Sequence, residues 1–320
     1  MDHHRPEERH EVGLCLDMTK RPGVDRYRAV MAPPLLGITL FPTAAGLHPA
    51  TLAREVEQRG FESLFLPEHS HIPASRETPW PGARPGAEDL PAYYWQINDQ
   101  LVSLSMAAAV TTDLKLGTAV TLVAQHDPIW LAKQLATLDR LSAGRVILGV
   151  GFAWNREQCR SHQVDFATRR ERTRDHVGIM RALWNEDPSS YAGDLRSLEP
   201  SWAYPKPQQL DGPPILLGGG WGPKLLSHLC EWADGWMPIS ARPSLASRLA
   251  LVRAEAERRG RDPNSISVTV MGAIEDAAGL AALGEEGVER AVLTIWPTES
   301  DAVLQELDRL AEIRRELDGT

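Results

Sequence analysis

This sequence of 320 residues contains no long apolar run. None of its apolar stretches approaches the roughly 20 residues that a membrane-spanning helix needs, and the N-terminal region has no signal-peptide core. We therefore expect a cytoplasmic protein that has no membrane partner.

Cysteine is also scarce. The three cysteines, Cys15, Cys159 and Cys230, lie far apart and form no CxxC pair. Neither a disulfide framework nor a zinc knuckle is indicated, so we expect buried or idle thiols. The chain also lacks a GxSxG elbow and a Cys–His pair at its strand ends, and nucleophilic hydrolysis therefore has little support.

Positive charge is in the minority, with 34 basic residues against 43 acidic ones and a net charge of −9. No basic patch with interleaved aromatic residues is present, so nucleic acid is not an expected partner. The acidity favours solubility rather than a specific function. The partner that we expect is a small-molecule substrate.

What the sequence does contain is a regular alternation of strand-like apolar runs with helix-like amphipathic stretches. Eight of each follow one another from Leu35 onward, which predicts a parallel (β/α)8 TIM barrel. We expect one barrel domain over residues 34–320, after a disordered N-terminal extension over residues 1–33. Met31 directly precedes the first strand and is an alternative start of translation. The predicted strands are Leu35–Phe41, Glu62–Leu66, Lys115–Val123, Arg145–Val150, Ile215–Leu217, Gly235–Ile239, Ser265–Met271 and Arg290–Ile295.

Helix signals fill the intervals between these strands, with Asp127 and Ser300 as caps of two of the helices. Two long loops interrupt the pattern, one over Pro67–Ile97 after the second strand and one over Asn185–Gly212 before the fifth. The first contains Trp80, Tyr93, Tyr94 and Trp95, which favours a lid or a subunit contact. We expect both loops to shape a pocket for an apolar or planar substrate.

The strongest local signal is the glycine run Gly218–Gly222, in which Trp221 is the one other residue. It lies where a strand should end and a helix should begin at Pro223. Glycine lets backbone N–H groups approach an anion closely, and the start of a helix adds unpaired N–H groups and a positive dipole end. The run therefore predicts a phosphate site, with Lys224 as a nearby cation; the alternative is a flexible turn.

The end of the fourth strand has a related pattern. Gly149 and Gly151 would admit a flat ring close to the backbone, and Trp154 could line its pocket. The alternative is a tight turn with a packing tryptophan.

Histidine follows the second strand in the segment Pro67–His71. His69 is a candidate for proton transfer, because its side chain titrates near neutrality. The pair His69-x-His71 also resembles the metal-binding pair of amidohydrolase barrels, but the later strand ends supply too few ligands for that hypothesis, and we predict no metal site. His126, after the third strand, could face the same pocket.

Three segments resemble the luciferase-like monooxygenase superfamily. They are LFLPEHSHIP (Leu64–Pro73), Leu114–Trp154 with its LDRLSAGRVILGVG motif, and Pro213–Ile239 with its GG…ADGW motif. Within the superfamily they are most similar to the branch that uses the deazaflavin coenzyme F420. The resemblance implies that the cofactor ring lies across the strand ends, near a non-proline cis peptide at Ala119–Val120, with its phosphate after Gly218–Gly220. The cofactor-binding residues implied in this way are Thr118, Ala119, Val120, Gly151, Trp154, Gly218, Gly219, Gly220, Trp221 and Gly222.

The same resemblance implies an oxidoreductase in which His69 moves a proton and Glu68 orients His69 or touches the ring. The expected reaction is hydride transfer between F420 and a small organic substrate. Sugar-phosphate oxidation is doubtful, because the sugar-phosphate dehydrogenases of this family have a Glu in the loop after the fourth strand, close to the position that Trp154 occupies here. The alternatives are an FMN-dependent monooxygenase with a separate cofactor reductase and a non-catalytic F420-binding protein. A homodimer is expected, since dimers are common in this family.

Overall fold

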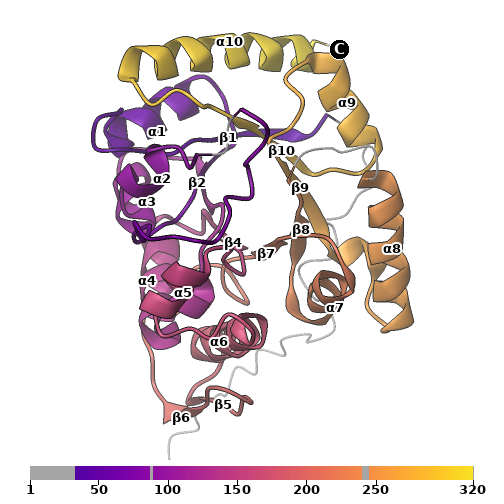
Figure 1. Cartoon of the computed structure of the whole chain (residues 1–320). Helices are drawn as coiled ribbons and strands as arrows, with labels where there is room; N and C mark the ends of the chain where they lie inside the picture. Colours follow the sequence, from indigo (N-terminus) through magenta and orange to yellow (C-terminus); the bar gives the residue numbers. More distant parts are fainter. Residues whose placement is uncertain (1–32, 87–88, 240–244, 320) are drawn as a thin grey trace, which may run out of the picture.

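The chain forms a closed barrel of eight parallel strands (Figure 1). This computed structural model describes residues 33–86, 89–239 and 245–319. Neighbouring strands follow the order β1-β2-β3-β4-β7-β8-β9-β10 and then close onto β1, so the prediction of a (β/α)8 barrel is confirmed. The predicted N-terminal extension lies outside the described residues, apart from residue 33. The barrel strands are β1 (Leu35–Thr39), β2 (Ser63–Leu66), β3 (Lys115–Thr118), β4 (Val146–Val150), β7 (Ile215–Gly218), β8 (Gly235–Met237), β9 (Ser267–Met271) and β10 (Arg290–Thr294).

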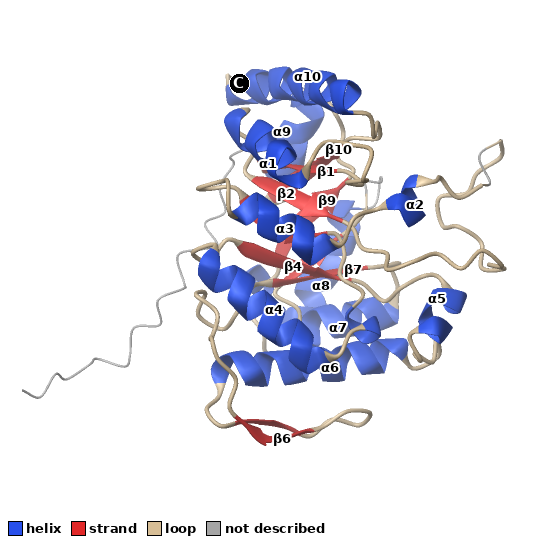
Figure 2. Cartoon of the chain, turned by 90° about the vertical axis from the view of Figure 1, so that its left-hand side faces the viewer, coloured by secondary structure: helices blue, strands red, loops and turns tan. Residues whose placement is uncertain are grey.

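Helices surround the barrel (Figure 2). Asp127 caps α4 as predicted, since its carboxylate accepts hydrogen bonds from the N–H groups of Ile129 and Trp130. Ser300 does not cap the last helix, because it is already the first helical residue and Glu299 takes the cap position. No helix in these described residues is both long and apolar enough to cross a membrane. The helices are α1 (Pro49–Gln58), α2 (Tyr93–Gln96), α3 (Gln100–Ala108), α4 (Pro128–Leu141), α5 (Arg156–Ser161), α6 (Arg169–Asn185), α7 (Pro223–Trp232), α8 (Leu245–Arg258), α9 (Ala277–Glu285) and α10 (Ser300–Asp318).

The barrel interior is filled by large apolar side chains from different strands. Phe65, Ile147, Leu216, Met237, Met271 and Val292 form one buried cluster, and each comes from a different strand. Gly117 on β3 makes room for this packing, because a Cβ atom there would lie 2.2 Å from the Phe65 ring. The interior is therefore a packed core, and a ligand site can form only at the ends of the strands.

The third strand is shorter than predicted. It ends at Thr118, and the chain continues through a cis peptide bond at Ala119–Val120 into a 3₁₀ turn over Val123–Gln125. Local polar contacts hold this path: the N–H of Thr121 donates to the carbonyl of Gly149, and the N–H of Leu122 donates to Glu68. These contacts outweigh the β propensity of the segment, so the prediction of a strand up to Val123 is wrong.

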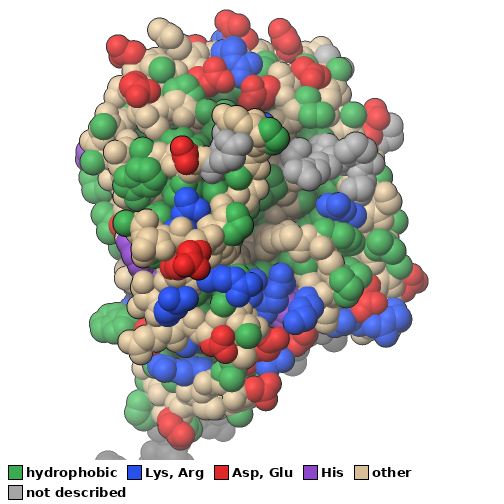
Figure 3. Space-filling model, in the orientation of Figure 1, with side chains coloured by type: hydrophobic (Ala, Val, Ile, Leu, Met, Phe, Trp, Pro, Cys, Tyr) green, Lys and Arg blue, Asp and Glu red, His purple; other side chains and the backbone are tan. Residues whose placement is uncertain are grey.

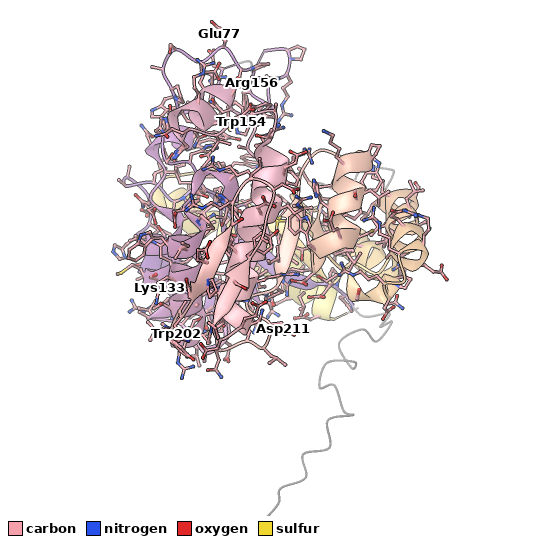
Figure 4. The ribbon with its side chains drawn as sticks, turned by 90° about the horizontal axis from the view of Figure 1, so that it is seen from below. Glu77, Lys133, Trp154, Arg156, Trp202 and Asp211 are labelled. Carbon is pink, nitrogen blue, oxygen red and sulfur yellow. The ribbon has the colours of Figure 1, made fainter. Side chains whose placement is uncertain are left out.

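The loop over residues 185–212 is not the plain loop that we predicted. It contains the antiparallel pair β5 (Ser189–Tyr191) and β6 (Leu198–Ser201), and Tyr191 lies close to Gly178 on α6. Figure 4 shows Trp202 and Asp211 at the end of the molecule opposite Trp154. A segment that joins a helix to the next strand lies at the amino ends of the strands, so the prediction that this loop shapes the pocket is wrong.

Acid is expected to destabilise the fold through His176. This α6 side chain is only 1% exposed, and its Nδ1 donates to the carbonyl of Val123, 3.0 Å away. Burial lowers its pKa to about 4, below the ordinary value of about 6.5. Between these two pKa values the side chain is protonated in the unfolded chain and neutral in the folded chain. The free energy of unfolding should therefore fall by roughly 2–3 kcal/mol as the pH drops from 6.5 to 4.

Urea unfolding at several pH values would measure this loss. The variant His176→Phe removes the titrating group, and its stability should fall less over the same pH window. An equal fall in both proteins would contradict the assignment to His176.

Candidate active site

The predicted site residues gather on one arc of the barrel rim. They follow β2, β3, β4 and β7, which are neighbours in the barrel. The carboxyl ends of parallel strands meet at one face, where the active sites of TIM barrels lie. Figure 3 shows this face with a hollow near its centre.

The floor of the site is the backbone at the ends of β3 and β4, which lie very close together. The expected cis peptide bond at Ala119–Val120 is present. A Cβ atom on Gly151 would lie 2.2 Å from the Val120 side chain, and one on Gly149 would lie 2.0 Å from the Thr118 carbonyl oxygen. Only glycine lets β4 approach β3 this closely, so both glycines have a packing role. Thr118 is fully buried, and its hydroxyl donates to the carbonyl of Gly149.

His69 stands beside this floor with aromatic neighbours. Its ring centroid lies 5.4 Å from that of Tyr94 and 6.0 Å from that of Trp154. The Tyr94 ring also meets Trp80 in a T-shaped contact, so the aromatic loop covers this part of the rim. Burial lowers the pKa of His69, while a hydrogen bond with Gln158 and the charge of Glu68 oppose the shift. The side chain is therefore neutral near pH 7.

The loop after β2 is fastened to α5 close to His69. The Glu157 carboxylate accepts hydrogen bonds from the Thr78 hydroxyl and from the N–H groups of Glu77 and Thr78. These bonds, the one from the hydroxyl first, lower the pKa of Glu157 to about 2. The attachment therefore persists at all physiological pH values. Figure 4 shows Glu77, Trp154 and Arg156 at the same end of the molecule.

Glu68 does not hydrogen-bond to His69, although we expected it to orient His69 or touch the ring. One of its oxygens accepts from Nε2 of His126 at 2.5 Å, and the other accepts from the N–H of Leu122 at 2.7 Å. Burial opposes the charged form of His126, but Glu68 and Asp99 more than compensate and raise its pKa. Glu68 therefore forms an ion pair with His126, and Gln158 is the hydrogen-bond partner of His69.

The glycine run after β7 forms an open turn at the start of α7. Gly219 has a φ of +147°, a conformation that favours glycine. Cβ atoms on Gly220 and Gly222 would meet no described residue within 4 Å, so the turn is open on the side of the described residues. Among the described residues, no side chain caps the N-terminus of α7, so its first N–H groups are available to bind an anion.

Arg170 is connected to this turn through the Phe152 ring, and sequence reasoning missed it. Its guanidinium lies 4.2 Å from the centroid of the Phe152 ring, and the same ring would be 3.5 Å from a Cβ atom on Gly219. Within the part of the chain that the structure describes, the buried Nη1 of Arg170 has no hydrogen-bond partner, although buried polar groups are nearly always paired. An anion at the glycine turn would supply one. The adjacent basic residues Arg169 and Arg170 at the start of α6 could have indicated this anion site from the sequence.

Two further arginines extend the positive charge along the rim. Arg156 and Arg169 lie on the Phe166 ring, with guanidinium carbons 4.3 and 3.6 Å from its centroid. Burial, followed by the charge of Arg170, lowers the pKa of Arg169. Figure 3 shows basic side chains gathered beneath the central hollow, over α5 and α6.

The alternative hypothesis of a metal site at His69 and His71 has no support at this rim. Across residues 33–86, 89–239 and 245–319, no group of three or more His, Cys, Asp or Glu side chains could hold a metal ion. His71 instead meets the Ser70 hydroxyl at 3.0 Å. Cys159 and Cys230 are buried and unpaired, as expected, and Cys15 lies outside the described residues.

Two curated relatives are similar to this chain in sequence. An uncharacterised protein of Mycobacterium tuberculosis is 38% identical over 251 residues, which cover 78% of this chain and 88% of the relative. A phthiodiolone/phenolphthiodiolone dimycocerosates ketoreductase of Mycobacterium tuberculosis is 34% identical over 173 residues, which cover 51% of this chain and 43% of the relative.

Among solved structures, the coenzyme F420-dependent tetrahydromethanopterin reductase of Methanopyrus kandleri has the same fold, with a TM-score of 0.67 and 16% identity over 87% of this chain and 98% of that chain. The family model described as luciferase-like monooxygenase matches residues 45–314. Since that match covers most of the chain and includes every predicted site residue, this chain belongs to the luciferase-like monooxygenase family.

Proposed function

We propose that this protein is an F420-dependent oxidoreductase that transfers a hydride between the deazaflavin and a small organic substrate. The observation that supports the choice of F420 is the group of three arginines, Arg156, Arg169 and Arg170, of which Arg170 is connected to the glycine turn through Phe152. FMN ends in its phosphate, whereas F420 carries carboxylates beyond it. Three guanidinium groups suit the more anionic cofactor.

The residues at the rim fit such a cofactor. The half-buried segment Ala119–Val120 offers a surface for a flat ring, and Trp154 lies beside His69 on the same rim. The open turn Gly219–Gly222 and the unpaired Nη1 of Arg170 fit the phosphate. When bound, the deazaflavin supplies or accepts the hydride, and the chain binds and orients the reactants.

His69 would accept or donate the proton that is transferred together with the hydride. Its ring is neutral near pH 7 because burial lowers its pKa. A neutral imidazole accepts a proton from a substrate hydroxyl as the carbon loses hydride, and the imidazolium returns it in the reverse direction. The aromatic side chains around His69 exclude water and favour an apolar or planar substrate.

The choice of cofactor is tested by titrating the purified apo-protein with F420 and with FMN, followed by tryptophan fluorescence. We expect selective, tight binding of F420. Selective binding of FMN would instead favour a monooxygenase that borrows reduced flavin from a separate reductase, and binding of neither would contradict the cofactor proposal.

Turnover distinguishes an enzyme from a non-catalytic F420-binding protein. Rapid-mixing absorbance of bound F420 with a panel of alcohols and ketones should show oxidation or reduction of the cofactor, whereas a protein that only stores F420 would show none.

A homodimer is part of the same proposal. Val102 on α3 and Trp130 on α4 are 63% and 69% exposed, which is apolar surface that a second copy would cover. Sedimentation equilibrium of the full chain measures the mass, and a monomer at all concentrations would contradict the dimer.

A further inference from the structure

We propose that Gln158 is a positioning residue that holds His69 as its Nδ1–H tautomer, so that Nε2 keeps a free lone pair for the substrate. The inference rests on the proposed function only for the proton-transfer role of His69. The tautomer itself is a property of the protein alone, and it can be measured without cofactor or substrate.

The direct contact joins residues that are 89 positions apart. Nδ1 of His69 lies 3.0 Å from Oε1 of Gln158, and Nε2 of Gln158 donates to the Ser70 hydroxyl at 3.4 Å. Gln158 is fully buried, so its amide has few alternative partners. No hydrogen bond to Nε2 of His69 occurs within the described residues, which leaves that nitrogen available.

An amide can turn over and exchange its oxygen and nitrogen, so the orientation of Gln158 needs an independent argument. Ser70 provides it, because a hydroxyl has one proton to donate. The shortest contact of the Ser70 hydroxyl is with Nε2 of His162, at 2.7 Å. If Ser70 donates there, its oxygen can only accept from its other two contacts, Gln158 and Nδ1 of His71, which lies 3.0 Å away. The amide nitrogen then faces Ser70, and the amide oxygen faces His69.

The state of His162 fixes the direction of that serine bond. Burial lowers the pKa of His162, so its ring is neutral near pH 7, and its interaction with the backbone carbonyl of Gln125 opposes the shift. A carbonyl only accepts, so the ring nitrogen that faces Gln125 carries the proton. Since Nε2 faces Ser70, the proton lies on Nδ1, and Nε2 is the acceptor of the Ser70 proton.

The three side-chain bonds therefore form one directed series. Ser70 donates to His162, Gln158 donates to Ser70, and Nδ1 of His69 donates to Gln158. A carboxamide does not titrate near neutrality, so the series does not conduct protons out of the site. It fixes the tautomer and the ring orientation of His69, as the partner of a catalytic histidine does in other enzymes.

Local hydrogen bonds fix the position of Gln158 on α5 relative to His69. The Asn155 side chain caps α5 by accepting the N–H of Gln158 at 2.8 Å. The attachment of Glu157 to the loop after β2 keeps the same helix against the segment that carries Ser70. Two contacts on consecutive α5 residues therefore set the distance between Gln158 and His69.

The test is nitrogen NMR of the apo-protein labelled with ¹⁵N in its histidine rings. The signals of His69 are those that disappear in His69→Gln. We expect wild-type His69 to be protonated at Nδ1 and bare at Nε2 at pH 8. Gln158→Met removes the acceptor and should move the proton to Nε2 in a large fraction of molecules. Gln158→Glu retains an acceptor, so this variant should keep the Nδ1–H form and raise the pKa of His69.

Gln58→Met is the matched control, because Gln58 is exposed at the end of α1, and it should leave the His69 signals unchanged. If Gln158→Met does not fold, Ser70→Ala serves instead, because the amide of Gln158 could then turn over and mix the tautomers. A bare Nδ1 in the wild type, or an unchanged tautomer in the folded variant, would overturn the proposal.

A kinetic readout separates positioning from folding. With F420 and a substrate that the panel identifies, Gln158→Met should lower turnover roughly 10–100-fold, the usual scale for a residue that orients a functional group, and leave the affinity for F420 unchanged. Turnover equal to that of the wild type would contradict the positioning role. The NMR result stands whether or not the protein uses F420.

Discussion

Replacing His69 by alanine is expected to lower turnover about 100-fold or more, the usual scale for loss of a general acid or base. The affinity for F420 should stay nearly intact, because His69 lies after β2 and the glycine turn that fits the phosphate lies after β7. Single-turnover absorbance of bound F420 measures the rate, and fluorescence titration measures the affinity. A rate equal to that of the wild type would remove His69 from the proton transfer.

The pH dependence gives a second check on the same residue. Burial lowers the pKa of His69 in the folded protein. In the direction that oxidises substrate, the neutral ring is the active form, so activity should be present at neutral pH. It should fall as the pH drops through a value below the ordinary 6.5. This acidic limb should disappear in His69→Ala, and its persistence would assign the limb to another group.

Replacing Arg170 by methionine is expected to weaken F420 binding about 100-fold without loss of fold stability. A charge-assisted hydrogen bond to phosphate is worth roughly 1.5–3 kcal/mol, and a buried Nη1 without a partner contributes no such bond to the apo-protein. Methionine keeps the apolar contact with Phe152. Fluorescence titration and thermal unfolding of the same samples measure the two effects.

Arg160→Met is the control for this variant, because Arg160 is exposed on the neighbouring helix α5. It should change neither affinity nor stability. Unchanged affinity in Arg170→Met would show that the phosphate lies elsewhere. Gly219→Val addresses the same turn from the other side, because valine disfavours the φ of +147° found there, and it should weaken binding as well.

Much of the fold could be predicted because the hydrophobic pattern is a local property. The eight strands and the two long loops follow from the order of apolar and amphipathic segments, and β4 and β7 lie where they were expected. The predictions fail where tertiary contacts override local preference. Residues 119–123 have strand-like side chains but make a turn held by Gly149 and Glu68.

The prediction that the loop over residues 185–212 shapes the pocket was wrong for a different reason. Its length and its prolines indicated function, but only the direction of the chain around the barrel decides which rim a loop occupies. This loop follows a helix, so it lies at the amino ends of the strands and packs on α6 through Tyr191 and Leu195, the N–H of which donates to Asp175.

The sequence by itself determined the barrel, the rim on which the site lies and the segments that approach one another there, because the connectivity of alternating strands and helices brings the carboxyl ends of the strands to one face. Only the tertiary structure decided which side chains contact one another at the site. Glu68 pairs with His126, 58 positions away, and His69 with Gln158, 89 positions away. Arg170 meets the glycine turn through Phe152. Such pairings depend on the packing of whole elements and leave no periodic signal in the chain.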